Sequence, residues 1–356
     1  MKINFKRKNN KKKEEDAKSK IVTQKNLEES REQVLSRGKK FKYPFQYSKH
    51  KLVINTIIIS VVAIIVLAIF GWIELYKAQN TGSVAYRFTK VLNLSVAKID
   101  DIKVRYSDYL MFYRSSINSI EYQQGELDDS DDSKMLRQHY KRQAMTSAED
   151  ASYALEKLNE AGIAVESSEV DELVAYHMLI NGQSRSMEAF TGIVSDNFGL
   201  SMTEYRRLLT LSLAKKKYSE HFDTEANELK DKIALKLKAN GGDMKAISDT
   251  YANNIAVLYE KTDSLVSDTN LDGGRVTEAM KLKNVGDISE PFASKKGDCY
   301  YIVKLTEKKD DKVRYESIRI SFTHLDSELK KLRDEGKVEE YINVTEGETV
   351  SLNEEK

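Results

Sequence analysis

Cysteine and histidine, which often act as nucleophiles, bases or metal ligands, are scarce in this chain of 356 residues. The one cysteine, Cys299, falls in an expected strand, where a lone cysteine is more often a small buried hydrophobe than a nucleophile. A single cysteine also leaves no internal disulfide. We expect neither a metal site nor a cofactor, because the five histidines show no metal-ligand spacing and no partner pattern. These are His50, His139, His177, His221 and His324.

An acidic run over Glu126–Ser133, with the sequence ELDDSDDS, carries enough carboxylates to raise the question of calcium. A loop of the EF-hand type needs a central glycine for its sharp turn and a distal glutamate that binds through both oxygens. The run has neither residue. We predict instead a solvated loop between two helices.

The most distinctive segment is Leu52–Ile73, which contains no charged residue. A helix of this length covers roughly 33 Å, against a hydrocarbon core of about 30 Å. Trp72 and Tyr76 fall where interfacial aromatic residues gather, and Lys51 and Lys77 close the two ends. Buried helices of soluble proteins are rarely apolar on all sides for so long. The segment therefore predicts a single transmembrane helix.

Charge is divided around this segment. Residues 1–51 contain 17 Lys and Arg against 6 Asp and Glu, a net charge of +11, and the remainder carries a net charge of −10. Because basic flanks are retained on the cytoplasmic side, we predict a single-pass protein of the cell membrane with a cytoplasmic N-terminus and an extracytoplasmic C-terminal domain. Cleavage as a signal peptide stays an alternative, because Ser83-Val84-Ala85 resembles a small-residue cleavage site.

The low-complexity tail Met1–Lys20 is expected to be disordered. Its basic cluster is compatible with binding nucleic acid or anionic lipid, or with a role limited to enforcing topology near the inner leaflet. No aromatic residues or binding motif accompany the lysines, so we favour the last interpretation and expect no nucleic acid. Residues 24–36 predict a short helix, after which Pro44 breaks the approach to the membrane.

Beyond the apolar segment, residues 76–92 are expected to form a connector. Alternating apolar residues in Ser95–Tyr106 surround Asp100-Asp101, a pattern that predicts a small β-hairpin. Apolar residues at helical spacing then predict a bundle with short connections, in which Ser201 and Glu204 form a capping box. Two helices are predicted over residues 133–161 and 187–197. Two more are predicted to begin at residues 167 and 201.

This order of elements resembles the N-terminal chaperone domain of the SurA/PrsA/PpiD group of exported foldases. The hairpin is succeeded by YSDYL at Tyr106–Leu110 and by AGIAVESSEVDELV at Ala161–Val174. NFGLSMTEYRRLL at Asn197–Leu209 and a lysine-rich helix end at Lys215–Lys217 complete the pattern.

The next part of the chain resembles the parvulin-type prolyl isomerase module of the same group. NGGDMKAI at Asn240–Ile247 is similar to the entry of that module, and Asp272–Gly274 to its glycine pair. GDISEPF at Gly286–Phe292, with Gly297 and the strand Tyr300–Leu305, is similar to its closing segment. The whole resemblance covers roughly residues 95–322.

The resemblance implies two histidines that this chain lacks. The position in the last strand falls at Tyr301. The first strand of the family module is missing from its usual place. The segment most like that strand is Val313–Phe322, which comes after the module. In this segment Ser317 occupies the histidine position. We infer that this strand completes the sheet in permuted order. The pocket aromatic expected near Val276 is also absent, and the pocket candidates are Met280, Phe292, Cys299, Tyr301, Ile320 and Phe322.

The predicted fold is thus a transmembrane helix, a helical SurA-like domain and a small α+β module. A helix over residues 324–336 is expected to pack back on the body, ahead of a polar tail from residue 344. The predicted segments are a basic tail (1–51), a transmembrane helix (52–75), a connector and hairpin (76–106), a helical chaperone domain (107–240), a parvulin-like module (241–322) and a C-terminal helix and tail (323–356).

The resemblance implies a membrane-tethered chaperone that binds unfolded or nascent exported polypeptides, with the secretion channel as a further candidate partner. Its isomerase module has lost the catalytic histidines. Two alternatives stay open. An active prolyl isomerase requires Tyr301 and Ser317 to lie close together beside a concave apolar surface. An envelope scaffold would bind one dedicated partner and no general clients.

Overall fold

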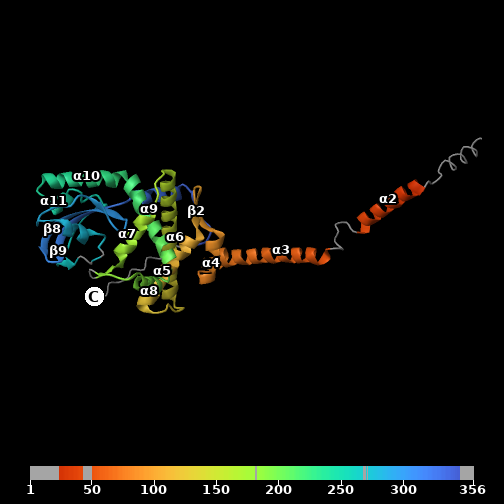
Figure 1. The fold of residues 1–356 in the computed structure, drawn as a ribbon. Coiled ribbons are helices and arrows are strands. Elements are labelled where there is room, and N and C mark those ends of the chain that lie inside the picture. Colours follow the sequence, from red (N-terminus) through yellow and green to blue (C-terminus); the bar gives the residue numbers. More distant parts are fainter. Residues whose placement is uncertain (1–23, 43–49, 181–182, 268–269, 271, 345–356) are drawn as a thin grey trace, which may run out of the picture. The chain divides into compact units, whose positions relative to one another are not determined.

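The computed structural model describes residues 24–42, 50–180, 183–267, 270 and 272–344 (Figure 1). The chain divides into two compact units, residues 1–73 and 74–356. The predictions for the tail Met1–Lys20, for Pro44 and for the last twelve residues lie outside the described residues.

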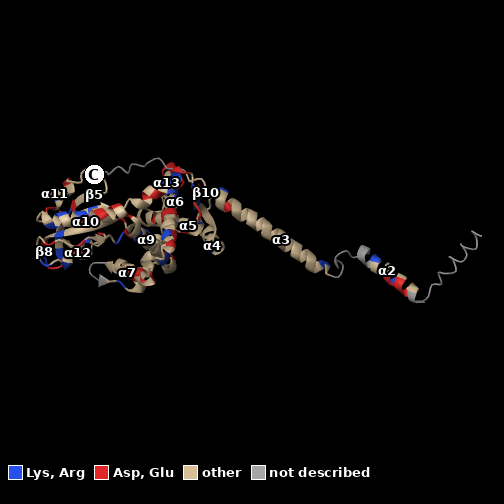
Figure 2. Cartoon of the chain, turned by 90° about the horizontal axis from the view of Figure 1, so that it is seen from above, with Lys and Arg blue, Asp and Glu red and all other residues tan. Residues whose placement is uncertain are grey.

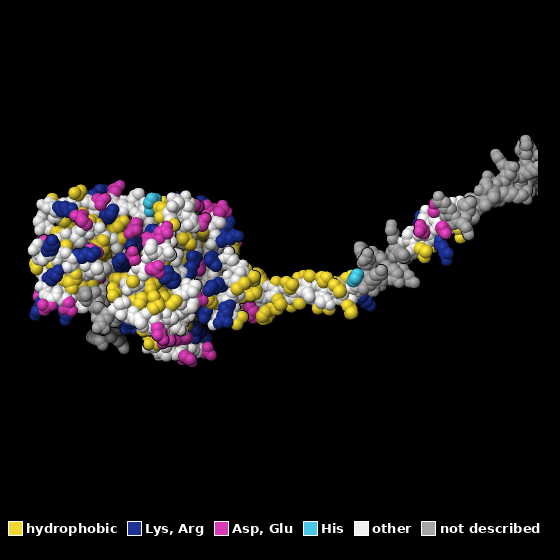
Figure 3. Space-filling model, viewed as in Figure 1, with side chains coloured by type: hydrophobic (Ala, Val, Ile, Leu, Met, Phe, Trp, Pro, Cys, Tyr) yellow, Lys and Arg dark blue, Asp and Glu magenta, His cyan; other side chains and the backbone are white. Residues whose placement is uncertain are grey.

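In the first unit, the described residues form helices α2 (Gln24–Lys42) and α3 (Lys51–Trp72). The helix predicted over residues 24–36 is confirmed and continues to Lys42. Helix α3 carries no charged side chain between its ends (Figure 2), and hydrophobic side chains cover it (Figure 3). None of its residues is buried. By length and composition this helix is able to cross a membrane.

The second unit begins with a helical body that encloses one hydrophobic core. The hairpin predicted around Asp100-Asp101 is confirmed as β1 (Ser95–Ile99) and β2 (Ile102–Arg105). The capping box is also confirmed, since Glu204 Oε2 accepts a hydrogen bond of 2.8 Å from the Ser201 backbone N–H. The helices of this body are α4 (Ser83–Leu92), α5 (Tyr106–Gln124), α6 (Asp131–Glu160), α7 (Ser167–Met178), α8 (Met187–Phe198) and α9 (Met202–Phe222). A short hairpin, β3 (Leu179–Ile180) and β4 (Gln183–Ser184), joins α7 to α8.

The prediction of a connector over residues 76–92 is wrong for Ser83–Leu92, which forms helix α4. Tyr86 and Thr89 are buried on its inner side, and the Arg114 guanidinium lies 4.9 Å from the centre of the Tyr86 ring. The small-residue triplet at 83–85 is the first turn of this helix. A π-helical turn, η1 (Ile73–Lys77), precedes it.

The acidic run at residues 126–133 uses its carboxylates locally. The Asp128 side chain accepts hydrogen bonds from Ser130 and Ser133, and these bonds hold the pKa of Asp128 at about 2. Helix α6 then begins at Asp131, two residues before the predicted start, with Ser130 as its N-cap. The run is thus a loop leading into a capped helix start.

The rest of the second unit is built on a five-stranded antiparallel sheet in the order β5–β9–β8–β7, with β6 also paired to β9. Strand β9 (Lys312–Ser321) lies between β5 (Val257–Lys261) and β8 (Cys299–Lys309). The inference that a strand over residues 313–322 joins this sheet is therefore confirmed. The remaining elements are β6 (Val266–Ser267), β7 (Phe292–Ala293), α10 (Thr224–Ala239), α11 (Met244–Asp249) and α12 (Arg275–Lys281).

Each face of the sheet has its own core, because side chains alternate between the two faces of a strand. Helix α12 covers one face, where Val276 and Ala279 pack on Val303 and Leu305. Helices α10 and α11 cover the other face, and Figure 1 shows α10 beside the sheet. The second core contains Ala226, Leu229, Ile233, Leu237, Met244, Ile247, Tyr300, Ile302, Ile318 and Ile320.

The chain returns to the helical body after the sheet. Helix α13 (His324–Asp334) buries three leucines in the core of that body, as the predicted C-terminal helix required. Strand β10 (Val338–Glu340) then pairs with β1, a pairing that the sequence pattern does not indicate. Since α10 packs with the sheet, we propose Asp223 as the boundary in place of residue 240. The helical body is then residues 74–222 and 324–344, and the sheet module is residues 223–323.

Two ion pairs fasten the returning segment to α6. The Arg142 guanidinium binds Glu340 at 2.7 and 3.0 Å, and Arg333 binds Glu149 at 2.6 Å. Glu149 is fully buried. Burial and then the nearby Glu340 carboxylate raise the pKa of Glu149 from 4.5 to about 7.

This raised pKa predicts a pH-dependent stability. Between about pH 4.5 and 7 the folded chain binds more protons at Glu149 than the unfolded chain, so the free energy of unfolding falls as pH rises through this range. We expect Glu149→Gln to flatten the decline that urea unfolding measures from pH 5 to 8. Glu156→Gln, an exposed change on the same helix, should behave as the wild type. Parallel profiles for wild type and Glu149→Gln would contradict the assignment.

Candidate functional site

The two positions that the family resemblance assigns to histidines lie on one face of the sheet. Strands β8 and β9 pair so that Val303 lies opposite Ser317 and Tyr301 lies opposite Arg319. Tyr301 and Ser317 are thus diagonal neighbours on the α12 side. Both are buried, with exposed fractions of 5% and 0%. Within the described residues, the Ser317 hydroxyl has no hydrogen-bond partner.

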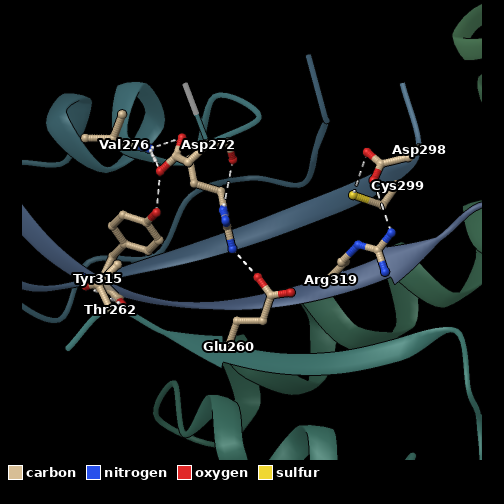
Figure 4. A network of polar contacts seen from close by, with 9 residues as sticks. Glu260, Thr262, Asp272, Val276, Asp298, Cys299, Tyr315 and Arg319 are labelled. Carbon is tan, nitrogen blue, oxygen red and sulfur yellow. Dashed lines mark hydrogen bonds and ion pairs between the residues drawn. The ribbon is translucent and has the colours of Figure 1, made fainter. Parts of the chain in front are cut away.

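The first residue of α12, Arg275, lies beside Tyr301. Its guanidinium lies 4.7 Å from the centre of the Tyr301 ring and 5.8 Å from that of Tyr315. It also forms an ion pair with Glu260, which comes from β5 (Figure 4). The β5 pairing places Glu260 directly opposite Ser317. A charged side chain, paired with a carboxylate, thus lies beside the Tyr301 and Tyr315 rings.

A buried carboxyl group fixes the start of α12 beside this cluster. The Asp272 side chain accepts hydrogen bonds of 3.1 and 3.2 Å from the Val276 backbone N–H and a further bond from the Tyr315 hydroxyl (Figure 4). Burial and then this bond to Asp272 raise the pKa of Tyr315 well above its usual value. The phenol therefore stays protonated and serves as a donor within the structure.

Cys299 is buried, as predicted. Its Sγ lies 3.4 Å from an oxygen of Asp298, which also pairs with Arg319 (Figure 4). Burial and the Asp298 charge raise the pKa of Cys299 to about 12. A thiol that remains protonated at neutral pH is a poor nucleophile.

The pocket candidates from the sequence do not converge on one cavity. Ile320 and Phe322 pack in the core under α10 and α11, on the opposite face of the sheet from Met280 and Phe292. The Phe292 ring lies 6.1 Å from that of Tyr301. The resemblance alone does not give the direction and register of the strands in the permuted sheet, so it could not separate the two faces.

Two hollows of the described structure lie along α9, between the helical body and the sheet module. Their volumes are about 610 and 390 Å³. They meet at Leu208 and Ser212 of α9 and at Lys296 of the β7–β8 loop, which line both. We call the pair the α9 groove. None of the sequence-based candidates except Phe322 lines it.

The loop approaches α9 closely because of one glycine. Gly297 has a φ of +78°, and a Cβ on it would lie 2.9 Å from the Cβ of Lys216. Any larger residue would therefore push the loop away from the helix as well as strain its backbone. In the sequence Gly297 is notable only as part of the closing segment, because its contact with α9 depends on the tertiary arrangement.

The groove is lined by a mixture of apolar, polar and charged side chains. Leu208 lies between the two halves, and the side chain of Ile255, at the mouth of the larger half, is 91% exposed. Lys215, Lys296, Asp298, Arg319 and Asp326 contribute charges to the lining of the larger half. A mixed lining of this kind is able to bury apolar side chains of an extended polypeptide and to hydrogen-bond its backbone. Further apolar lining residues are Phe112, Leu211 and Phe322 in the larger half and Leu173, Tyr176, Phe198 and Leu209 in the smaller half.

His177 in the smaller half is held in the neutral form. Its Nδ1 lies 2.8 Å from the Tyr205 hydroxyl, and burial lowers the pKa of the imidazole. With Tyr176 and Phe198 it presents an aromatic wall. The histidine is thus part of the apolar lining, where it adds no charge.

Residues 45–219 match a family model described as the SurA-like N-terminal domain. The match includes the apolar helix α3 and extends to the last turns of α9, so it covers the α5, α6 and α9 residues that line the α9 groove and leaves out those of α13. It supports a relationship to the SurA and PpiD type of exported folding factor. No curated protein and no solved structure matches the chain.

Proposed function

We propose that this protein is a membrane-anchored chaperone that holds unfolded, newly exported polypeptides at the outer face of the cell membrane. The SurA-like match supports a chaperone-type folding function outside the cytoplasm. The observation that carries the proposal is the open α9 groove, whose lining combines apolar side chains of that SurA-like region with residues of the sheet module.

The groove would act by reversible burial of client side chains. Each buried aliphatic or aromatic side chain contributes about 1.5–3 kcal/mol, and ordering the client removes part of that gain. When the cost of ordering the client is subtracted from the free energy of several such contacts, the net binding free energy corresponds to a dissociation constant of about a micromolar. Binding of this strength is weak enough for clients to leave. The charged side chains of the lining keep the groove wetted when it is empty.

Anchoring supplies the local concentration that modest affinity lacks. Helix α3 is the proposed span, and the net charge of +11 on residues 1–51 supports a cytoplasmic N-terminus near anionic lipids. The folded unit then faces the exit side of a secretion channel, where clients emerge unfolded.

The geometry around Tyr301 favours a sheet module without isomerase activity. An active parvulin-like site needs a concave apolar surface for the proline ring, whereas the charged Arg275, paired with Glu260, lies beside the Tyr301 ring. We propose that the module retains the parvulin-like arrangement in permuted order and serves as one wall of the groove.

The test uses the full chain in lipid nanodiscs and measures two activities. We expect it to suppress aggregation of several unrelated unfolded proteins and to leave the rate of prolyl cis/trans exchange in a model peptide unchanged. Faster exchange that disappears in Tyr301→Ala would make the protein an enzyme. If the chain suppresses the aggregation of none of these proteins, the alternative of a scaffold with one dedicated partner would be favoured.

A further inference from the structure

Helix α4 carries an apolar stripe that is largely exposed in the described structure. Val84 and Val91 are 83% and 81% exposed, and Phe88 and Leu92 are 40% and 51% exposed. At about 100° per residue these four positions fall within roughly one third of the helix circumference. The opposite side holds Tyr86 and Thr89, which are buried against the helical body.

Both charged side chains of α4 are basic and exposed. Arg87 borders the apolar stripe, and Lys90 lies between Arg87 and the buried Tyr86 around the helix. Lys90 also lies 3.6 Å from Glu204 of α9, which holds α4 to the helical body together with the hydrogen bond from Arg114 to Ser83. An exposed apolar face with basic residues and no acidic residue on the same helix is typical of helices that lie in the interface of an anionic membrane.

The position of α4 in the chain points to the same partner. Only five residues separate its first residue, Ser83, from Lys77, where the helical stretch containing the proposed span ends. That link is folded back, because the Asn80 backbone and side chain both donate hydrogen bonds to Glu74, at 2.9 and 3.0 Å. The N-terminal end of α4 is therefore held near Glu74, within a few residues of the expected membrane surface.

We propose that α4 is an interfacial helix that inserts its stripe of Val84, Phe88, Val91 and Leu92 into the outer leaflet of the membrane. This inference rests on the proposed membrane anchor. A second contact besides the span would fix the orientation of the folded unit, because α4 is packed rigidly on α5 through Tyr86. A single flexible tether would leave that orientation free.

The test places a nitroxide spin label at Val91→Cys in the full chain, in vesicles of phosphatidylcholine and phosphatidylglycerol. Cys299 is buried, so the wild type serves as the unlabelled blank. The matched control is Leu235→Cys on α10, where the side chain is 68% exposed. We expect the ratio of collisions with oxygen to collisions with a water-soluble nickel complex to be several-fold higher at residue 91 than at residue 235. Val84→Cys should behave as Val91→Cys.

The other outcomes separate this inference from the proposed function. Equal ratios at residues 91 and 235, in a chain that floats with the vesicles, would overturn the interfacial helix and leave the anchor in place. A chain that does not float with vesicles would overturn both. Dipolar broadening at residue 91 that is lost on dilution with unlabelled chain would show that a second copy covers the stripe, and would also overturn the inference.

Discussion

Replacing Leu208 with glutamate is expected to weaken the binding of unfolded polypeptide about 100-fold. Leu208 lies where the two halves of the α9 groove meet, so a client in either half would contact it. The change removes an apolar contact worth about 1.5–3 kcal/mol and places a charge that the bound client would have to desolvate. A total of about 3 kcal/mol corresponds to the expected loss of affinity. Fluorescence anisotropy with a labelled, permanently unfolded polypeptide measures it.

Leu235→Glu is the matched control. It adds the same charge to a leucine of α10 that does not line the groove, so its affinity should equal that of the wild type. Ile255→Glu provides a second groove variant with little risk to folding, because its side chain is 91% exposed. We expect a smaller loss there, about tenfold, since only part of the side chain would be covered by a client. Wild-type affinity in both groove variants, with unchanged circular dichroism, would rule out the α9 groove as the client site.

Replacing Asp223 with alanine is expected to lower the free energy of unfolding by about 3–5 kcal/mol, because three hydrogen bonds to one buried carboxylate are lost together. Asp223 lies where the chain leaves the helical body, beside Thr323, where the chain comes back. One side-chain oxygen caps α10 by accepting from the Ala226 N–H at 2.9 Å. The other accepts from the backbone N–H groups of Thr323 and His324 at 2.8 and 3.0 Å. Because Asp223 is 1% exposed, water cannot readily replace these bonds.

Asp243→Ala isolates the capping part of this effect. Asp243 caps α11 with one bond of 2.9 Å to the Ala246 N–H, a bond that lies within a single turn of the chain. We expect its replacement to cost about 1 kcal/mol, the usual value for a lost N-cap. Urea unfolding of both variants in detergent gives the comparison. Equal losses in the two variants would show that Asp223 is only a helix cap. Its bonds to Thr323 and His324 would then add nothing to the connection between the two segments that link the helical body to the sheet module.

Local sequence patterns accounted well for the separate elements. The hairpin around Asp100-Asp101, the box at Ser201 and Glu204, and the C-terminal helix after His324 depend on neighbours within a few residues, so the sequence was sufficient to predict them. Helix α4 was missed because its exposed apolar stripe and its buried side, with Tyr86, are both short. Strand β10 was missed because a three-residue strand containing two glutamates has almost no strand signal, and its pairing with β1 supplies the stability.

Three features could be read directly from the order of residues. They are the apolar helix, the division of charge around it, and the presence of Tyr301 and Ser317 at the positions where the family resemblance implies histidine. These are properties of composition and spacing, which do not depend on distant contacts. The three-dimensional arrangement was needed to show that the Arg275 guanidinium lies beside the Tyr301 ring and that Leu208 and Lys296 line both halves of the α9 groove. Both arrangements depend on segments that are far apart in the chain. The central strand β9 brings together the strands of the sheet, and Gly297 lets the β7–β8 loop approach α9.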